Sequence, residues 1–469
     1  MIQSADATTL AASLARGDIT ALELTDAAIA DVEQRDGTLN AVVVRDFDCA
    51  RTAAMVADER LRDGVRLPLL GVPITIKESF DVAGLVTSWG LDSFRDSQAS
   101  EDAVAAARLR AAGAIILGKT NVSEGLNGWN AVNPVYGRTG NPVAPGLSPG
   151  GSSSGAAAAI AAGFVPLDIG SDLGGSIRGP AQFCGIYGHV ASGGLIPLRG
   201  HALAGRKARF DLSCPGPMAR SARDLDLALG LMAGPDEDEA TAYRLELPPP
   251  RTQTIKGLRV LVLDEHPMVP TDLEVRGAVQ LVAAALQENG ATVRPALGII
   301  PDVAEQTRTY LRLLGGAVAL GMSLNDQDAL AFQSRQTDPA SVNGLRLSGM
   351  LASHAEWLEA NEARVKLCWA WRNVFRDHDL LVCPAFSVPA LTTEQTKEAT
   401  ILVDGKPFNR EDSVAWTAMG NTARLPATVV PVAKTRDGRP LCVQIIGPYL
   451  EDRTTIAAAA MLTDLLGQT

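Results

Sequence analysis

The chain has 469 residues, of which 46% are hydrophobic and 20% are charged, so it can bury a large core. Its formal net charge of −11 argues against nucleic acid or an anionic membrane surface as a partner. The first residues lack the pattern of a secretory signal, no uncharged apolar run reaches transmembrane length, and the six scattered cysteines are typical of reduced thiols, so a cytoplasmic protein without membrane contact is expected.

The N-terminal segment, residues 1–65, is predicted to be helical. From Thr8 to Arg35 the apolar residues recur with helical spacing in two stretches, which Gly17-Asp18 separates. We therefore expect a pair of helices ahead of the rest of the fold.

A strand is predicted at the end of the apolar run from Leu67 to Ile76, where Val72, Ile74 and Ile76 alternate. It ends in Lys77, one of only eight lysines among the 42 basic residues. A desolvated lysine can lose its proton, whereas an arginine stays charged in a protein. Lys77 is the best candidate for a neutral base, and a lysine that extends from the strand end to solvent is the alternative that this pattern leaves open.

Two serines further along the chain, Ser152 and Ser176, each follow a Gly-Gly pair directly. An attacking hydroxyl needs a base, and adjacent glycines let backbone N–H groups approach the reacting oxygen as an oxyanion hole requires. Between these serines, residues 153–162 are predicted to form an alanine-rich helix, with Ser153 and Ser154 as caps or hydrogen-bond donors instead of nucleophiles. The pattern indicates serine-based catalysis.

Other motifs fit less well. Gly151 to Gly155 matches G-x-S-x-G, which would make Ser153 the nucleophile of an α/β-hydrolase, but a loop-like run precedes it and no histidine stands out as its partner. Gly113 to Thr120 matches the phosphate-loop pattern, but its middle residues form a bulky apolar strand. No spacing typical of a metal site occurs, so neither a metal nor another cofactor is implied.

Strands and helices alternate through the remaining chain and indicate an α/β fold. We expect one domain over residues 1–469. Its predicted parts are a core at 66–233, a polar connector with three prolines in a row at 234–256, and a further α/β part at 257–469, which includes a mostly helical region at 302–371 and final strands at 427–431 and 441–446 that complete the sheet.

With these motifs in order, the chain resembles the amidase signature hydrolases, and the resemblance covers essentially its whole length. The matching segments are Gly71–Lys77, Gly118–Asn121, Asn141-Pro142, Ser148–Ser153, Asp172–Arg178, Cys184-Gly185, Gly216–Ser221, Asp379–Pro384, Leu425–Ala427 and Val443–Pro448.

The resemblance implies an α/β/α sandwich with a central mixed sheet covered by helices. It also implies a triad of Ser176 as nucleophile, Ser152 held by a cis peptide bond as proton relay, and Lys77 as base. The implied oxyanion hole consists of backbone N–H groups in the segment Leu173-Gly174-Gly175-Ser176. The helical region 302–371 would lie near the substrate pocket, as it does in the family.

The implied substrate-binding residues are Leu126, Asn127, Gly128, Trp129 and Ser153. Trp129 and Trp416 are candidate pocket walls, with core packing as the alternative for each. Glu78 and Ser171 depart mildly from the family pattern. Val190, Ala191 and Leu195 replace more typical family residues. His189, Leu195 and the run Pro197–His201 are more similar to the broad aryl- and alkyl-amide branch than to the glutamine-using subunit.

The expected activity is hydrolysis of a small carboxylic amide to an acid and ammonia or an amine. The alternative is a glutaminase subunit of a tRNA-dependent amidotransferase complex. The expected partner is the small-molecule amide itself, with a homodimer left open and no nucleic acid or membrane. Esters, ureas and carbamates stay open as further substrates.

Overall fold

A mixed sheet of eight strands occupies the centre of the molecule, in the order β10-β9-β11-β15-β14-β7-β8-β6. The computed structural model describes residues 4–319 and 322–467. Strand β9 pairs in parallel with β10 and β11, and the remaining neighbours are antiparallel, so the expected mixed α/β architecture is confirmed. The strands are β6 (Leu167–Asp172), β7 (Tyr187–Val190), β8 (Cys214–Ala219), β9 (Arg259–Val262), β10 (Thr292–Pro295), β11 (Leu380–Pro384), β14 (Ala427–Lys434) and β15 (Pro440–Ile446).

The strand that ends in Lys77 belongs to a second, smaller sheet with the order β1-β3-β2. These strands are β1 (Val42–Arg45), β2 (Pro73–Lys77) and β3 (Ile115–Thr120). Every residue of β2 and β3 is buried, which explains their almost continuous apolar character. Lys77 lies opposite Thr120 in the parallel β2–β3 pair and is therefore held at the end of a rigid strand.

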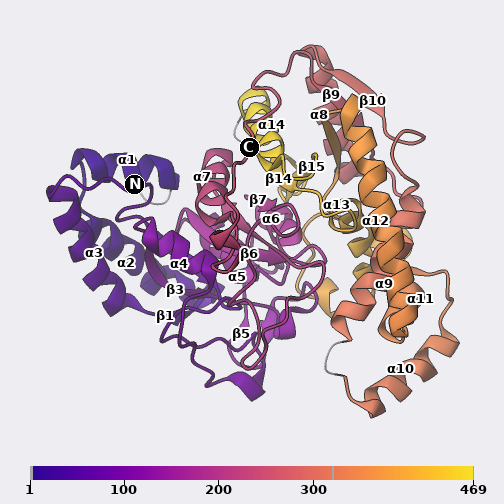
Figure 1. The fold of residues 1–469 in the computed structure, drawn as a ribbon, viewed down its shortest axis with the longest axis horizontal. Coiled ribbons are helices and arrows are strands. Elements are labelled where there is room, and N and C mark those ends of the chain that lie inside the picture. Colours follow the sequence, from indigo (N-terminus) through magenta and orange to yellow (C-terminus); the bar gives the residue numbers. More distant parts are fainter. Residues whose placement is uncertain (1–3, 320–321, 468–469) are drawn as a thin grey trace.

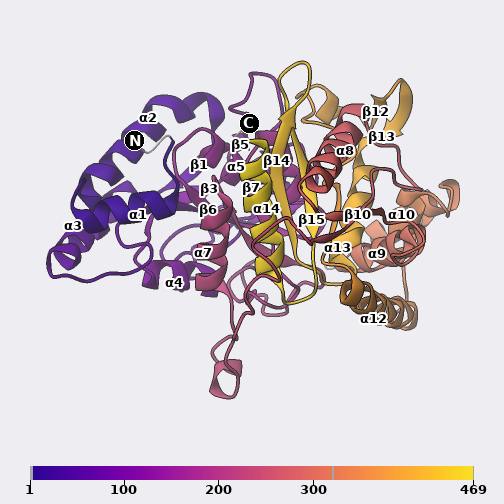
Figure 2. The same cartoon turned by 90° about the horizontal axis from the view of Figure 1, so that it is seen from above.

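Helices form the two ends of the molecule (Figures 1 and 2). One end consists of the N-terminal helices, and the Thr20 side chain and Glu23 form a capping box that begins the second of them. The other end consists of the helices between residues 303 and 377. The helices at the two ends are α1 (Ala7–Arg16), α2 (Ala21–Leu39), α3 (Phe47–Arg62), α9 (Val303–Val318), α10 (Leu324–Gln336), α11 (Val342–Met350) and α12 (His354–Asp377).

The remaining helices lie along the sheets. They are α4 (Val104–Ala111), α5 (Ser154–Ala161), α6 (Arg178–Cys184), α7 (Ala222–Met232), α8 (Leu273–Glu288), α13 (Ala418–Asn421) and α14 (Asp452–Leu466). Short strands occur at β4 (Val132–Asn133), β5 (Gly137–Arg138), β12 (Thr400–Val403) and β13 (Lys406–Asn409), and 3₁₀ turns at η1 (Asp92–Phe94), η2 (Glu124–Leu126), η3 (Glu239–Thr241), η4 (Gln395–Lys397) and η5 (Arg410–Thr417).

Helix α5 packs closely because its side chains are small. The four alanines from Ala156 to Ala159 are fully buried. A Cβ added at Gly155 would lie 2.2 Å from the backbone nitrogen of Asn121, which immediately follows β3, so only glycine fits there. This contact brings the start of α5, with Ser152 just ahead of it, against the end of β3.

The last two strands are not at an edge of the sheet. They complete the sheet, as the sequence predicts, by lying in its middle, where β14 and β15 join β7 on one side to β11 on the other. Alternation of apolar residues does not reveal strand order, because central and edge strands of a covered sheet have the same pattern. The sheet contains strands that precede the connector at 234–256 and strands that follow it. The expectation of one domain stays a prediction.

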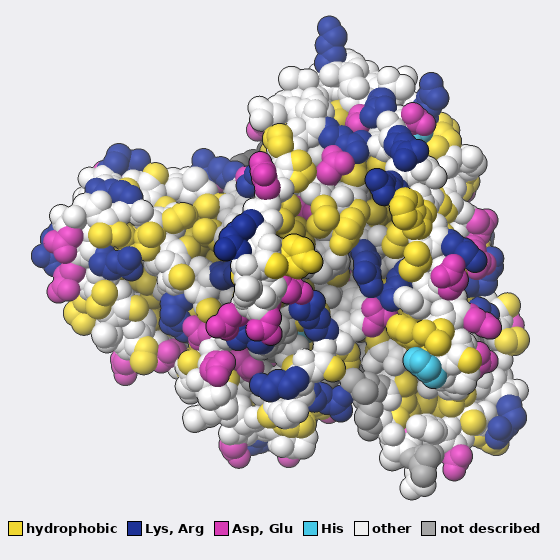
Figure 3. Space-filling view, viewed as in Figure 1, with side chains coloured by type: hydrophobic (Ala, Val, Ile, Leu, Met, Phe, Trp, Pro, Cys, Tyr) yellow, Lys and Arg dark blue, Asp and Glu magenta, His cyan; other side chains and the backbone are white. Residues whose placement is uncertain are grey.

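On the face shown in Figure 3, basic and acidic side chains are interspersed, and neither sign forms a broad patch. Within the described part of the chain, no helix combines the length and the apolar character that a membrane span requires.

Candidate active site

The Lys77 side chain lies at the centre of a buried polar cluster. Its Nζ is 2.8 Å from Oγ of Ser152 and 2.9 Å from Oγ of Ser171, and 3.4 Å from the Ser171 carbonyl oxygen. Lys77 comes from the end of β2, Ser171 from β6 and Ser152 from the loop before α5. The strand-end alternative, in which this lysine reaches solvent, is wrong, because the side chain is completely buried.

Burial lowers the pKa of Lys77 to about 7, against the opposing influence of the Asp172, Asp168 and Glu78 carboxyl groups. Asp168 is also completely buried. One of its oxygens accepts hydrogen bonds from the hydroxyls of Thr75, at 2.6 Å, and Thr120, at 3.0 Å, and the other oxygen has no partner in the described structure. Burial raises the pKa of Asp168 to about 7, although these hydroxyls favour its ionised form.

The loops of Ser152 and Ser176 lie side by side. The Gly151–Ser152 peptide bond is cis, as the family resemblance implies. The backbone N–H of Ser153 donates to the carbonyl oxygen of Ser176 at 3.2 Å. Ser152 is 1% exposed and Ser176 is 9% exposed, so Ser176 is the more accessible of the two serines.

Asp172 organises the turn that leads to Ser176. Its carboxylate accepts hydrogen bonds from the backbone N–H groups of Gly175, at 2.9 Å, and Ile177, at 3.0 Å. The N–H of Gly175 is therefore already engaged by Asp172, whereas the roles predicted for the N–H groups of Leu173, Gly174 and Ser176 stay predictions. Within the described structure, the N–H groups of Gly174 and Ser176 have no internal acceptor, which leaves them available to an oxyanion.

Arg178 anchors the same turn to the C-terminal part of the chain. Its guanidinium pairs with Asp172 at 2.8 Å and donates to side-chain oxygens of Asn421 and Gln444, each also at 2.8 Å. Burial opposes ionisation of Asp172, but Arg178 and the backbone N–H groups outweigh it and lower the pKa of Asp172 to about 2. The turn is thus held by a fully buried ion pair that stays charged at neutral pH.

The predicted substrate-binding segment lies against Gly151. A Cβ added at Gly151 would lie 2.6 Å from the carbonyl oxygen of Gly128 and 3.2 Å from Cα of Trp129. The Trp129 ring is buried edge-on against Phe386, with ring centroids 4.6 Å apart. Leu126 is partly exposed and Asn127 is exposed, so the segment runs from the interior to the surface.

The structure favours the core-packing alternative for Trp416, and it shows no helix cap by Ser153, whose predicted substrate-binding role stays a prediction. Trp416 is completely buried, donates its indole N–H to Thr271 and packs edge-on against His266, so core packing describes it better than a pocket wall. Ser153 precedes α5, but its hydroxyl makes no capping bond and has no partner. A cap requires the side chain to turn back towards the helix, and here the serine faces the interior beside Gly170, whose added Cβ would lie 3.2 Å from the Ser153 hydroxyl oxygen.

Of the positions that depart from the family pattern, Ser171 contacts Lys77, and the others have structural roles. The Glu78 carboxylate accepts from the backbone N–H groups of Ser88, at 2.6 Å, and Trp89, at 2.9 Å, and so holds the loop that follows β2. The three replacements further on are apolar and buried, and they belong to the hydrophobic core: Val190, Ala191 and Leu195.

Side chains of α9 and η5 that the sequence analysis did not name contact the turn before Ser176. The hydroxyl of Tyr310, on α9, donates to the Leu173 carbonyl oxygen at 2.9 Å, and Thr417 donates to Tyr310 at 3.0 Å. A Cβ added at Gly174 would lie 3.3 Å from both Tyr310 Oη and Val414 Cγ2. Residues 303–318 of the predicted helical region therefore do contact the oxyanion turn.

A hydroxyl, an imidazole and a carboxylate also meet elsewhere in the molecule. His189 contacts Thr428 Oγ1 at 2.9 Å through Nδ1 and Asp452 Oδ1 at 3.1 Å through Nε2. All three residues are completely buried. A nucleophile without access cannot meet a substrate, so this cluster joins β7, β14 and α14 without providing a second active site. Among the described residues, no group of His, Cys, Asp and Glu side chains is arranged to hold a metal ion.

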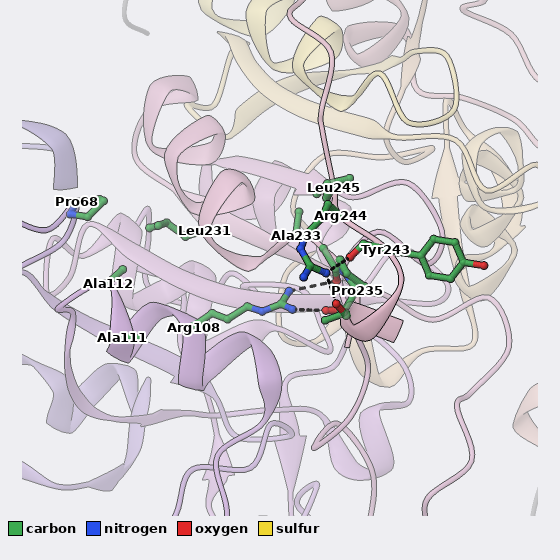
Figure 4. A pocket seen from close by; sticks show the side chains of 12 residues that line it. Pro68, Arg108, Ala111, Ala112, Leu231, Ala233, Pro235, Tyr243, Arg244 and Leu245 are labelled. Atoms are coloured by element: carbon green, nitrogen blue, oxygen red, sulfur yellow. Dashed lines mark hydrogen bonds between the residues drawn. The ribbon is translucent and has the colours of Figure 1, made fainter. Parts of the chain in front are cut away.

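Figure 4 shows a pocket of about 520 Å³ between α4, α7 and the connector. Arg108 extends into it and donates to the carbonyl oxygens of Met232 and Pro235, each at 2.6 Å, while the Tyr243 ring points away. Arg108 thus provides a hydrogen-bond donor for the carbonyl oxygen of Met232, the last residue of α7. The pocket is lined by no residue of the Lys77, Ser152 and Ser176 cluster, so its size does not make it the candidate active site.

Comparison with known proteins gives a consistent result. The family model described as Amidase matches residues 23–456. A putative amidase, AmiB2, of Mycobacterium tuberculosis is 35% identical over 98% of this chain and 95% of its own length, and an acylamidase of Rhodococcus erythropolis is 32% identical over 97% and 94%. A solved structure, described as a vestigial protein complex that reveals the origins of an s-triazine catabolic enzyme, has a TM-score of 0.84 and 31% identity over 98% of both chains.

Proposed function

The chain belongs to the amidase signature family, and we propose that it hydrolyses a small carboxylic amide through an acyl-enzyme formed on Ser176. The observation that carries this proposal is the 2.8 Å contact between Lys77 Nζ and Ser152 Oγ in a completely buried site. Such a contact suits proton transfer, because a lysine kept from water is readily neutral.

The protonation state of Lys77 determines the direction of its hydrogen bonds. A neutral amine has two N–H donors and one lone pair. With the two N–H groups directed to Oγ and the carbonyl oxygen of Ser171, at 2.9 and 3.4 Å, the lone pair accepts the Ser152 hydroxyl proton. Ser171 is therefore a positioning residue that orients the base towards Ser152.

In the proposed acylation, Ser176 Oγ forms a bond to the amide carbon and its proton passes to Ser152, while the Ser152 proton passes to Lys77. The tetrahedral oxyanion is stabilised by the N–H groups of Gly174 and Ser176. The C–N bond then breaks, and the leaving nitrogen receives a proton back through the same relay. Attack of water on the acyl-enzyme, assisted by the same groups, releases the acid and restores Ser176.

A stand-alone amidase is favoured over the glutaminase-subunit alternative. The net charge of −11 opposes contact with tRNA, and His189, Leu195 and the run Pro197–His201 resemble the broad amide-hydrolysing branch. Hydrolysis of simple amides by the purified chain alone distinguishes the two functions.

Intact-mass analysis after treatment with a fluorophosphonate tests the proposal. We expect one adduct, mapped to Ser176 by peptide analysis, and loss of this labelling in Lys77→Ala and Ser176→Ala. Ser153→Ala is the matched control, since Ser153 is also a buried serine and contacts the Ser176 backbone, and this variant should still label at Ser176. An adduct on Ser153 in the wild-type protein would contradict the assignment and support the elbow motif.

A further inference from the structure

One face of the 3₁₀ segment η5 lies along the candidate active site. In a 3₁₀ helix, side chains three residues apart lie one above another. Thr417 Cγ2 would be 3.0 Å from a Cβ added at Gly175, and Val414 Cγ2 would be 3.3 Å from one added at Gly174. The next position on this face is Glu411, which therefore continues the same wall.

Glu411 lies beside the predicted substrate-binding segment. Its Oε1 would be 4.0 Å from a Cβ added at Gly128, the residue whose carbonyl oxygen packs against Gly151. Because Gly128 has no side chain, there is space beside the Glu411 carboxylate. Gly128 itself packs against Gly151, the residue before Ser152. The Glu411 side chain is 29% exposed, so it can be reached from solvent.

The charges near Glu411 are partly balanced. Arg410 Nη1 forms an ion pair with Glu411 Oε1 at 2.5 Å, and the Arg410 side chain is 14% exposed. The neighbouring Asp412 is on a different face of η5; it interacts with Arg346 of α11, and burial raises its pKa to about 6. Within the described structure, Oε2 of Glu411 has no hydrogen-bond or ion-pair partner.

We propose that Glu411 is a specificity-determining residue that favours acyl groups carrying an ammonium at their far end. The inference rests on the proposed amidase function. A carboxylate on the wall of a partly desolvated site attracts a cation more strongly than it would in water, and it disfavours a like charge. Glu411 takes no part in the bond-breaking steps, so its effect belongs to substrate binding.

The test compares 4-nitroanilides whose acyl chains have equal length and end in an ammonium, a methyl or a carboxylate group, over a series of chain lengths. In the wild-type protein the ammonium substrate should have the highest kcat/KM at one length. In Glu411→Gln the ammonium-to-methyl ratio should fall by about fivefold or more, mainly through KM, as expected for the loss of an interaction of about 1 kcal/mol. The carboxylate substrate should gain, because Arg410 loses its partner.

Asp412→Asn removes the same charge from the adjacent residue and is the matched control; its ammonium-to-methyl ratio should stay at the wild-type value. Glu411→Asp retains the charge and should still prefer the ammonium substrate over the methyl substrate. An unchanged ratio in Glu411→Gln, or an equal fall in Asp412→Asn, would overturn the inference. Labelling of Ser176 by the fluorophosphonate verifies that each variant is folded, and a wild-type protein that neither labels nor hydrolyses any of the substrates counts against the amidase proposal instead.

Discussion

At the scale of single residues, the chemistry depends on how the fold treats one lysine. Among the residues that the structure describes, no carboxylate is in hydrogen-bonding contact with Lys77, and its three close polar neighbours are neutral oxygens of Ser152 and Ser171. A surface lysine would be fully protonated at neutral pH. Burial on a rigid strand therefore makes this amine a base without any other chemical change.

The pH dependence of turnover should show this. Because the proposed base must be neutral, kcat/KM should rise tenfold per pH unit below the Lys77 pKa of about 7 and level off above it. The measurement is a pH profile with a neutral amide substrate. A profile that is flat from pH 5 to about 9 would be inconsistent with a lysine base.

Asp168 provides a second residue-scale prediction. Its carboxyl group favours the protonated form of Lys77, so Asp168→Asn should move the midpoint of the profile to lower pH. Asparagine retains the shape and can still accept from Thr75 and Thr120. A role confined to packing would lower stability and leave the midpoint unchanged, so the midpoint, measured together with Tm, separates the two roles.

At the scale of elements, the Asp172–Arg178 turn is where packing limits the sequence most tightly. Gly175 has a φ of +96°, and a Cβ added to it would lie 2.5 Å from Cζ of Phe386. Gly174 has more room, since its nearest neighbours would be 3.3 Å away. Both glycines belong to one motif, but only Gly175 is required by a positive φ and by close packing against Phe386.

Alanine substitutions should separate these constraints. Gly175→Ala must shift the turn and with it the N–H groups of Gly174 and Ser176, so kcat should fall by about 100-fold or more. Gly174→Ala requires only a small movement of Tyr310 or Val414, and its loss should stay within about tenfold. Steady-state kinetics and the thermal midpoint of each variant provide the comparison; equal losses would mean that crowding by Phe386 does not control the turn.

At the scale of the whole molecule, the cluster of His189, Thr428 and Asp452 ties the last helix to the sheet. His189→Ala leaves two buried polar partners incompletely satisfied and should lower the free energy of unfolding by about 1–3 kcal/mol. Turnover per folded molecule should stay close to the wild-type value, because none of the three residues contacts the Lys77 cluster. Denaturant unfolding and active-site titration measure both quantities. A folded His189→Ala protein without turnover would show that an imidazole base had been overlooked.

The sequence motifs predicted local structure, and the family resemblance predicted that Lys77 and Ser152 meet, but neither identified Tyr310 or Glu411. The motif segments correctly indicated the strand before Lys77, the alanine-rich helix and the two Gly-Gly-Ser turns, because each follows from a short pattern. Tyr310 and Glu411 carry no such pattern, and Tyr310 meets Leu173 across 137 positions of the chain. Their place at the site follows only from how η5 and α9 pack against the turn. The hydrogen bond from the Gly175 N–H to Asp172 could not be predicted from the sequence either, since it depends on the orientation of the Asp172 side chain.

The strand order affects how the chain can fold during its synthesis on the ribosome. The two strands that join β7 to β11 are the last to be synthesised, as β14 begins at Ala427 and β15 ends at Ile446. A nascent chain that already contains Lys77, Ser152 and Ser176 still lacks the middle of its sheet, and Arg178 still lacks Gln444. Until β14 and β15 have been synthesised, the strands on either side of them lack their central partners, and we expect the nascent chain to depend most on a chaperone during this interval.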